Sequence, residues 1–116
     1  MKVMIVDDNA EMRALIRSLL RDAAQEFVEC ADGAEAVDTF LTHRPEWTLM
    51  DVVMPGMDGL AATRAIKARF PEARILIITQ SDNCKLRDSA REAGATDFLG
   101  KEDLDQLEGI VTGRDN

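Results

Sequence analysis

The fold of this chain is decided by the segment Leu49-Met50-Asp51-Val52-Val53-Met54-Pro55-Gly56-Met57-Asp58-Gly59. The segment begins in a short apolar run, and its Pro-Gly and Asp-Gly pairs favour a tight turn, so it is typical of a buried strand that ends in a turn. Asp51 lies where the strand ends. Because an unpaired carboxylate there carries a desolvation cost, its presence indicates a functional site.

Length and charge restrict the class of protein. The chain has 116 residues and a formal net charge of -8 at pH 7, which suits one domain, residues 1–116, that buries roughly two-thirds of its unfolded surface. The acidic excess argues against a direct nucleic-acid footprint, and the apolar runs are too short to span a membrane. A signal-peptide pattern is missing at the N-terminus. We therefore expect a cytoplasmic globular protein.

The residues that most often carry metal or redox chemistry are few. Cys30 and Cys84 are too far apart in the sequence for a zinc site or a disulfide framework. Cys30 lies in an apolar stretch, which favours a buried thiol, whereas Cys84 lies near an expected helix start. His43 lies beside Arg44 and close to Pro45, a context typical of a solvated loop residue.

Apolar runs alternate with helical periodicity along the whole chain. The runs predict five strands, at residues 3–6, 27–30, 47–50, 75–78 and 97–100. Apolar residues spaced by three and four predict helices around residues 12–20, 36–41, 60–69, 85–93 and 104–111.

This alternation predicts an α/β fold. Each crossover between parallel strands returns on the same hand, so we expect a five-stranded parallel sheet with helices on both faces and strand order 2-1-3-4-5. In a sheet of this type the ligand crevice lies beyond the carboxyl ends of the strands. The residues at those ends are therefore the candidates for function.

Polar residues follow four of the five predicted strands. Asp7 and Asp8 come after the first strand, Asp51 after the third, Thr79 after the fourth and Lys101 after the fifth. Although they come from separate segments, the expected fold brings them to one pocket. This convergence is the main sequence evidence for a site.

The chemistry of these side chains suits phosphoryl transfer. Close carboxylates repel one another and need a cation, and an all-oxygen ligand set with room for water favours Mg²⁺ over Ca²⁺. The Lys101 ammonium would neutralise further charge on a phosphoryl group, and the Thr79 hydroxyl would donate a hydrogen bond to it. Asp51 is then the nucleophile that forms an acyl phosphate.

Simpler structural roles exist for some of these residues. Asp7, Asp8 and Asn9 are also suited to cap the helix that follows them. Asp58 lies past the strand end, so we expect it only to form its turn. The joint occurrence of acids, hydroxyl and ammonium at four strand ends favours a functional site over these separate explanations.

The chain resembles the CheY-like receiver domain of bacterial two-component response regulators, which has a flavodoxin-like fold. The resemblance runs from residue 2 to about residue 111. It is carried by the Val-Asp-Asp that ends at Asp8, the Met-Asp-Val-Val-Met-Pro-Gly-Met-Asp-Gly segment at 50–59, Thr79, the Gly-Ala-Thr-Asp-Phe segment at 94–98, and Lys101. The spaced acids, the threonine and the lysine together form a specific signature.

The resemblance implies a phosphorelay function. Asp51 would be the phosphoacceptor, and a histidine kinase or a histidine phosphotransfer protein would be the donor. Asp7, Asp8, Asp51 and the backbone carbonyl of Val53 would hold Mg²⁺. The domain would catalyse its own aspartyl phosphorylation and dephosphorylation.

The resemblance also implies a conformational switch. Thr79 and Phe98 match the family's switch pair, in which the hydroxyl turns towards the phosphoryl group and the ring moves inward. The surface of the fourth helix, fifth strand and fifth helix would report the change. The expected partner is a downstream protein or an output domain of a longer regulator, and phosphorylation would allow a homodimer.

Three residues depart from the family pattern: Gln80, Glu102 and Gly100, of which Gly100 is expected to loosen the end of its strand. Gln80 stands where a small residue usually follows the threonine, so we expect its amide to modulate phosphoryl lifetime and phosphodonor access. Glu102 stands where many members have proline after the lysine. Since a cis bond before a non-proline residue costs about 2.5 to 4 kcal/mol, we predict a trans peptide between Lys101 and Glu102.

Three other functions are compatible with a fold of this class. A flavin module of similar topology would need hydroxyls and glycines after its first strand, where Asp7 and Asp8 would repel a phosphate. A metal-dependent phosphohydrolase would need a second acid beside Asp51, where this chain has Val52 and Val53. The remaining alternative is a receiver-shaped interaction domain that binds its partner without phosphorylation.

Overall fold

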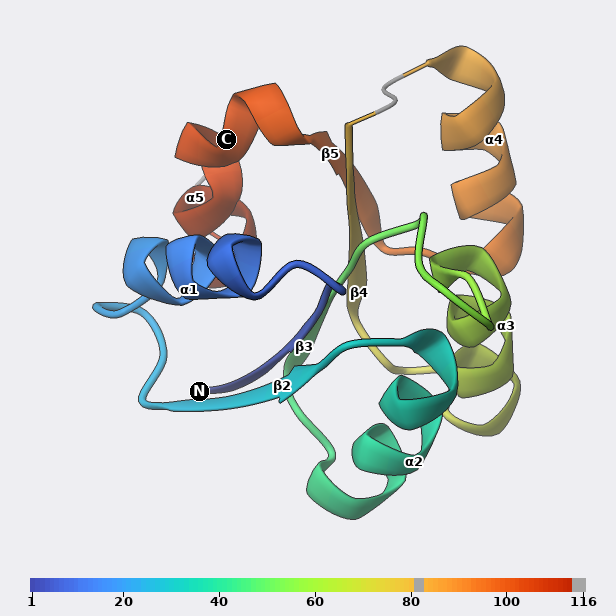
Figure 1. Ribbon diagram of the computed structural model, residues 1–116, viewed down its shortest axis with the longest axis horizontal. Helices are drawn as coiled ribbons and strands as arrows, with labels where there is room; N and C mark the ends of the chain where they lie inside the picture. Colours follow the sequence, from blue (N-terminus) through green and yellow to red (C-terminus); the bar gives the residue numbers. More distant parts are fainter. Residues whose placement is uncertain (81–82, 114–116) are drawn as a thin grey trace.

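A computed structural model describes residues 1–80 and 83–113 of the protein (Figure 1). Strands and helices alternate along it, as the sequence predicts. In chain order the elements are β1 (Lys2–Val6), α1 (Ala10–Leu19), β2 (Glu26–Cys30), α2 (Gly33–His43), β3 (Trp47–Met50), α3 (Gly59–Arg69), β4 (Ile75–Thr79), α4 (Cys84–Ala93), β5 (Asp97–Gly100), the 3₁₀ helix η1 (Lys101–Gln106) and α5 (Leu107–Thr112).

The five strands form one parallel sheet in the order β2-β1-β3-β4-β5, which confirms the predicted topology. Helices α1 and α5 cover one face of the sheet, and α2, α3 and α4 cover the other (Figure 1). The register pairs Val6 with Met50 and Thr79 with Gly100. Strands β1, β2 and β3 therefore end level with one another, and β4 ends level with β5 but extends beyond β3, whose Met50 pairs with Ile77. The residues that follow the strands thus come to one edge of the sheet.

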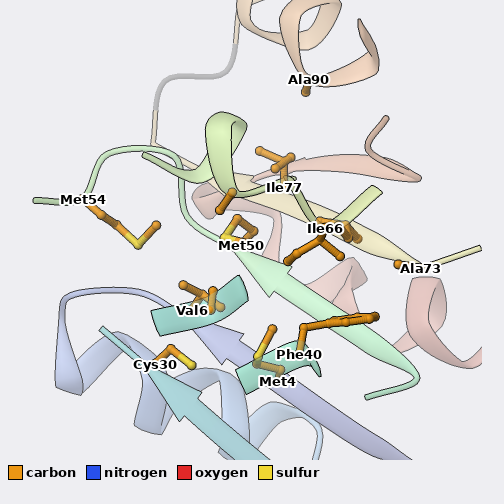
Figure 2. Close-up of a cluster of buried hydrophobic side chains, with 13 residues drawn as sticks. Met4, Val6, Cys30, Phe40, Met50, Met54, Ile66, Ala73, Ile77 and Ala90 are labelled. Atoms are coloured by element: carbon orange, nitrogen blue, oxygen red, sulfur yellow. The ribbon is translucent and has the colours of Figure 1, made fainter. Parts of the chain in front are cut away.

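Two hydrophobic clusters hold the helices against the sheet. Alternate strand residues point to opposite faces, so β1 sends Met4 and Val6 to one cluster and Val3 and Ile5 to the other. Figure 2 shows the cluster under α2 and α3, where Phe40 and Ile66 meet side chains of the strands. Because both faces are covered, the strands are apolar throughout and lack the alternation of a half-exposed sheet.

Capping side chains place the starts of two helices one residue earlier than the sequence pattern predicts. The Asp58 carboxylate accepts a hydrogen bond from the amide of Ala61 (2.8 Å), so α3 begins at Gly59. The Asn83 side chain accepts one from the amide of Leu86 (2.8 Å), so α4 begins at Cys84. Asp58 thus caps a helix as well as forming its turn.

The last predicted helix, over residues 104–111, is two elements. Residues Lys101–Gln106 form η1, and a short α5 follows from Leu107. The backbone of Asp103 (φ -112°, ψ 27°) departs from helical geometry, so η1 is itself kinked at that residue. This arrangement lets Lys101 follow β5 directly while Leu107 is fully buried in the core.

The apolar pattern of α1 is wider than its buried face. Ile16 and Leu20 are buried against the sheet, as expected, but Leu15 and Leu19 are 45% and 37% exposed. Only part of the predicted stripe therefore packs in the core.

Two further predictions concern the backbone and the membrane. The peptide bonds of the described residues are all trans, which confirms the predicted trans bond between Lys101 and Glu102. Among the described helices, none combines the length and the hydropathy needed to cross a membrane.

Candidate functional site

A cleft of about 320 Å³ opens at the carboxyl ends of the strands. It contains the residues that the sequence placed at the strand ends, although they come from four separate segments. Its lining consists of Asp7, Asp8, Asn9, Asp51, Val53, Thr79, Gln80 and Lys101.

Backbone hydrogen bonds of the sheet position the two buried acids of the cleft, Asp7 and Asp51. The amide of Asp7 donates to the carbonyl of Cys30 (3.1 Å), and the amide of Asp51 donates to the carbonyl of Val6 (2.9 Å). Both residues thus extend the ladders of their strands by one bond. Because Val6 and Met50 pair in register, Asp7 and Asp51 emerge side by side.

The acids form a compact oxygen cluster. Asp7, Asp8 and Asp51 each offer one carboxylate oxygen, and these atoms all lie within 4.8 Å of one another. Asp7 and Asp51 are buried, at 2% and 7% exposed, whereas Asp8 faces solvent. A cluster of oxygen ligands that is partly open to water fits a hard divalent cation.

Lys101 lies against both buried acids. Its ammonium nitrogen is 3.1 Å from Asp7 Oδ2 and 3.6 Å from Asp51 Oδ1. The lysine side chain is largely buried, so these ion pairs are poorly screened by solvent. One ammonium against three carboxylates leaves the cleft with a net negative charge.

The protonation of Asp51 reflects this excess of negative charge. Burial, followed by the neighbouring Asp7 carboxylate, raises the pKa of Asp51 to about 6. The Lys101 ammonium and a hydrogen bond from the Val52 amide to Asp51 Oδ1 (2.9 Å) act in the opposite direction, and Asp8 raises the pKa further. Asp51 is therefore mostly ionised at neutral pH but is held in an unfavourable environment.

Thr79, Gln80 and Val53 complete the rim of the cleft. Thr79 ends β4 and is buried at 2% exposed, whereas Gln80 is exposed next to it. Both line the cleft. Val53 is 74% exposed, so its side chain does little packing there.

Phe98 lies outside the cleft. This β5 residue is half-buried, and the guanidinium carbon of Arg87 lies 4.6 Å from its ring centroid. The ring borders a separate cavity of about 180 Å³ between α4 and β5, which Arg87 and Arg91 also line. Of the expected switch pair, Thr79 therefore lines the cleft and Phe98 lines the separate cavity.

Two residues outside the predicted set of site residues, Asn9 and Gly59, support the site. Of the three candidate caps after the first strand, Asn9 is the N-cap of α1, and its side chain accepts from the amides of Glu11 and Met12. The preference of asparagine for N-caps was the available signal. Gly59 packs on the backbone of Asp51, a contact for which an Asp-Gly pair gives no sequence signal.

The sequence of the chain is similar to known receiver domains. The family model of the response regulator receiver domain matches residues 3–112. The chemotaxis protein CheY of Bacillus subtilis is 36% identical over 101 residues, which are 86% of this chain and 84% of that protein.

A longer relative and a solved structure show the same likeness. A protein-glutamate methylesterase/protein-glutamine glutaminase of Geobacter metallireducens is 36% identical over 93% of this chain, which spans 31% of that relative's length. The crystal structure of a LuxR-family two-component response regulator from an Aurantimonas species is 33% identical, with a TM-score of 0.85, over 97% of this chain and 85% of that one. The chain therefore belongs to the response regulator receiver domain family, the CheY-like receivers of two-component systems.

Proposed function

We propose that Asp51 accepts a phosphoryl group from a phosphohistidine of a histidine kinase or a histidine phosphotransfer protein, in a reaction that depends on Mg²⁺. One observation carries the proposal: the buried Asp51 carboxylate shares a cleft with two other acids and lies 3.6 Å from the Lys101 ammonium. Membership of the receiver family supports it.

The transfer is a nucleophilic displacement at phosphorus. A carboxylate oxygen of Asp51 forms a new P–O bond while the P–N bond to the donor imidazole breaks, and the electron pair of that bond leaves with the imidazole. The product is an acyl phosphate. With a pKa of about 6, Asp51 is mostly ionised at neutral pH and so carries the electron pair needed for attack.

The carboxylates of Asp7, Asp8 and Asp51 and the backbone carbonyl of Val53 would hold the magnesium ion. All-oxygen ligands, an exposed Asp8 and the net negative charge of the cleft fit that ion. Bound there, Mg²⁺ would supply positive charge that offsets the charge of the phosphoryl oxygens.

Lys101 and Thr79 supply hydrogen bonds to the phosphoryl group. The Lys101 ammonium already lies between two carboxylates at the cleft and pairs with the charge that arrives on Asp51. Thr79, at the end of β4, donates its hydroxyl to a phosphoryl oxygen. Gln80 stands at the rim, where its amide modulates how long the acyl phosphate survives and which donors reach it.

The output of this chemistry is a change of the surface formed by α4, β5 and α5. A conformer in which Thr79 donates to the phosphoryl group is favoured over one in which it does not, and Phe98 moves inward with it. That surface then binds a downstream protein, an output domain or a second copy of the chain.

The test is to incubate the protein with Mg²⁺ and acetyl phosphate, and separately with beryllofluoride. We expect a labile phosphoryl adduct in the intact mass and shifted backbone amide resonances along β4, α4 and β5. Asp51→Asn removes both responses because it removes the nucleophile.

Asp58→Asn is the matched control, because Asp58 lies in the same loop and asparagine also caps a helix. It should keep both responses. If the wild type gains no adduct and its amide resonances do not move, the phosphorelay function is wrong and the alternative is favoured, a receiver-shaped domain that binds its partner without phosphorylation.

A further inference from the structure

Arg13 links Asp7, which lines the acidic cleft, to the edge strand β2. It lies in α1, where its Nη1 donates to the backbone carbonyl of Asp7 (2.6 Å) and its Nε donates to Glu29 Oε1 (2.9 Å). The side chain of Arg13 is 18% exposed. Arg13 does not line the cleft itself.

These contacts close a ring through strand β2. The amide of Asp7 donates to the carbonyl of Cys30, and the carbonyl of Asp7 accepts from Arg13, which is bound to Glu29, the neighbour of Cys30. Asp7 is therefore tied to β2 on both sides, once through backbone and once through a pair of charged side chains.

The carboxylate of Asp7 is held as well. Its Oδ1 accepts from the amide of Asn9 (2.9 Å), and its Oδ2 accepts from Lys101 (3.1 Å). Repulsion among the three acids acts to push the β1–α1 loop outward. The bonds at the Asp7 backbone oppose that repulsion, so the orientation of the carboxylate depends on them.

We propose that Arg13 is a positioning residue for the divalent cation: it holds the Asp7 carboxylate in the orientation that binds the ion, although Arg13 does not itself line the cleft. The inference rests on the magnesium site proposed above. Groups that orient a metal ligand from outside typically change metal affinity by 10- to 100-fold.

Geometry and charge predict opposite effects of removing Arg13. If the guanidinium acted only through its charge, its loss would strengthen cation binding, because a positive charge near the site would be gone. If it acts through the Asp7 carbonyl, its loss weakens cation binding. The sign of the change therefore separates the two.

The neighbouring Arg17 provides a matched control. It pairs with the other oxygen of Glu29 and is half exposed. Arg17→Ala removes the same charge from the same helix and from the same carboxylate partner. It leaves the hydrogen bond between Arg13 and the Asp7 carbonyl in place.

The experiment is a calorimetric titration of Mg²⁺ into the full chain, well below the melting temperature of each variant. We expect Arg13→Ala to weaken Mg²⁺ binding by roughly tenfold and Arg17→Ala to change it by less than about twofold. Arg13→Lys keeps the charge but lacks the planar fork that reaches two partners, so it should resemble Arg13→Ala.

A second readout needs no metal. Without Mg²⁺, the amide of Asn9 should exchange with solvent faster in Arg13→Ala and Arg13→Lys than in the wild type or Arg17→Ala, because its acceptor on Asp7 is less firmly held.

Other outcomes would contradict either the positioning role of Arg13 or the magnesium site itself. Unchanged or tighter Mg²⁺ binding in Arg13→Ala, or full affinity in Arg13→Lys, contradicts positioning through the carbonyl. Equal weakening by Arg17→Ala assigns the effect to Glu29 and overturns the role of Arg13. If Arg13→Ala does not fold, Arg13→Lys decides. A wild type that binds no Mg²⁺ overturns the magnesium site itself.

Discussion

Gly59 presses against the backbone of Asp51: a Cβ atom at position 59 would lie 1.9 Å from the Asp51 carbonyl oxygen. The amide of Gly59 also donates to the carbonyl of Val52 (2.9 Å). The first turn of α3 is thus packed directly on the end of β3. The proposed phosphoacceptor is held from this side by a helix start that has room for hydrogen alone.

Gly59→Ala should therefore disturb Asp51. The methyl group forces the helix start and the strand end apart, and overpacking of this kind destabilises a protein by about 1 to 3 kcal/mol. Urea unfolding followed by circular dichroism measures the loss. The amide resonances of Asp51 and Val52 should be among the most shifted in the folded variant.

Gly56→Ala serves as the comparison. It lies in the same loop at φ +73°, but a Cβ there meets nothing within 4 Å. Its cost is the left-handed backbone strain alone, about 1 to 2 kcal/mol. If the two variants leave the Asp51 resonances equally unmoved, packing of Gly59 on Asp51 does not control the site.

The raised pKa of Asp51 predicts a pH-dependent cost to stability. With a pKa of about 6 in the folded chain and 3.8 as the ordinary value, the native state binds the extra proton between these pH values. The free energy of unfolding therefore falls as pH rises from about 4 to 6. The destabilisation caused by ionising Asp51 in the folded chain is complete above pH 6. It amounts to roughly 2 to 3 kcal/mol.

Asp51→Asn removes that cost. In chelator and without Mg²⁺, the melting temperature of Asp51→Asn should exceed that of the wild type at pH 7 to 8, and the two should converge near pH 4. Asp58→Asn, an exposed residue of the same loop, should show no such convergence. A constant difference between wild type and Asp51→Asn from pH 4 to 8 would contradict the raised pKa.

The contact between Arg87 and Phe98 should stabilise the resting position of the ring. A cation over an aromatic face contributes about 0.5 to 1 kcal/mol at a partly exposed site. If Phe98 leaves Arg87 on activation, Arg87→Ala favours the activated state. The concentration of beryllofluoride that half-saturates the protein, followed by amide resonances, should fall by roughly 2- to 5-fold.

Arg91→Ala controls for charge. Arg91 lines the same cavity and pairs with Asp88 (3.3 Å). Removing a positive charge should by itself weaken binding of an anion, so Arg91→Ala should leave the half-saturating concentration unchanged or raise it. Equal behaviour of the two variants would rule out a specific effect of the ring contact.

The two thiols should differ sharply in reactivity. Cys30 is 2% exposed, and burial raises the pKa of its thiol, whereas Cys84 is exposed at the start of α4. In the native protein an aromatic disulfide reagent should modify Cys84 quickly. It should modify Cys30 at roughly one hundredth of that rate or slower, because Cys30 reacts only when the fold opens.

Absorbance of the released thiolate measures both reactions. Cys84→Ser should abolish the fast phase and keep one slow equivalent, which becomes fast in denaturant. A fast equivalent that persists in Cys84→Ser would show that Cys30 is accessible in the native chain.

Much of the fold was predictable from local patterns. Apolar runs at 3–6 and 75–78 indicate strands covered on both faces, and their alternation with helical periodicity restricts the topology to few arrangements. Since parallel strands end at a common edge, the positions of Asp7, Asp51 and Lys101 in the sequence sufficed to predict that they meet. The structure brings these three side chains together.

The sequence by itself determined which residues reach the cleft, because strand periodicity and strand ends are local properties of the chain. The tertiary structure decided how they are held. The packing of Gly59 on Asp51 and the bond from Arg13 to the Asp7 carbonyl join residues on different elements. Their distances depend on how helices pack on the sheet, and the residues themselves carry no signal of that packing.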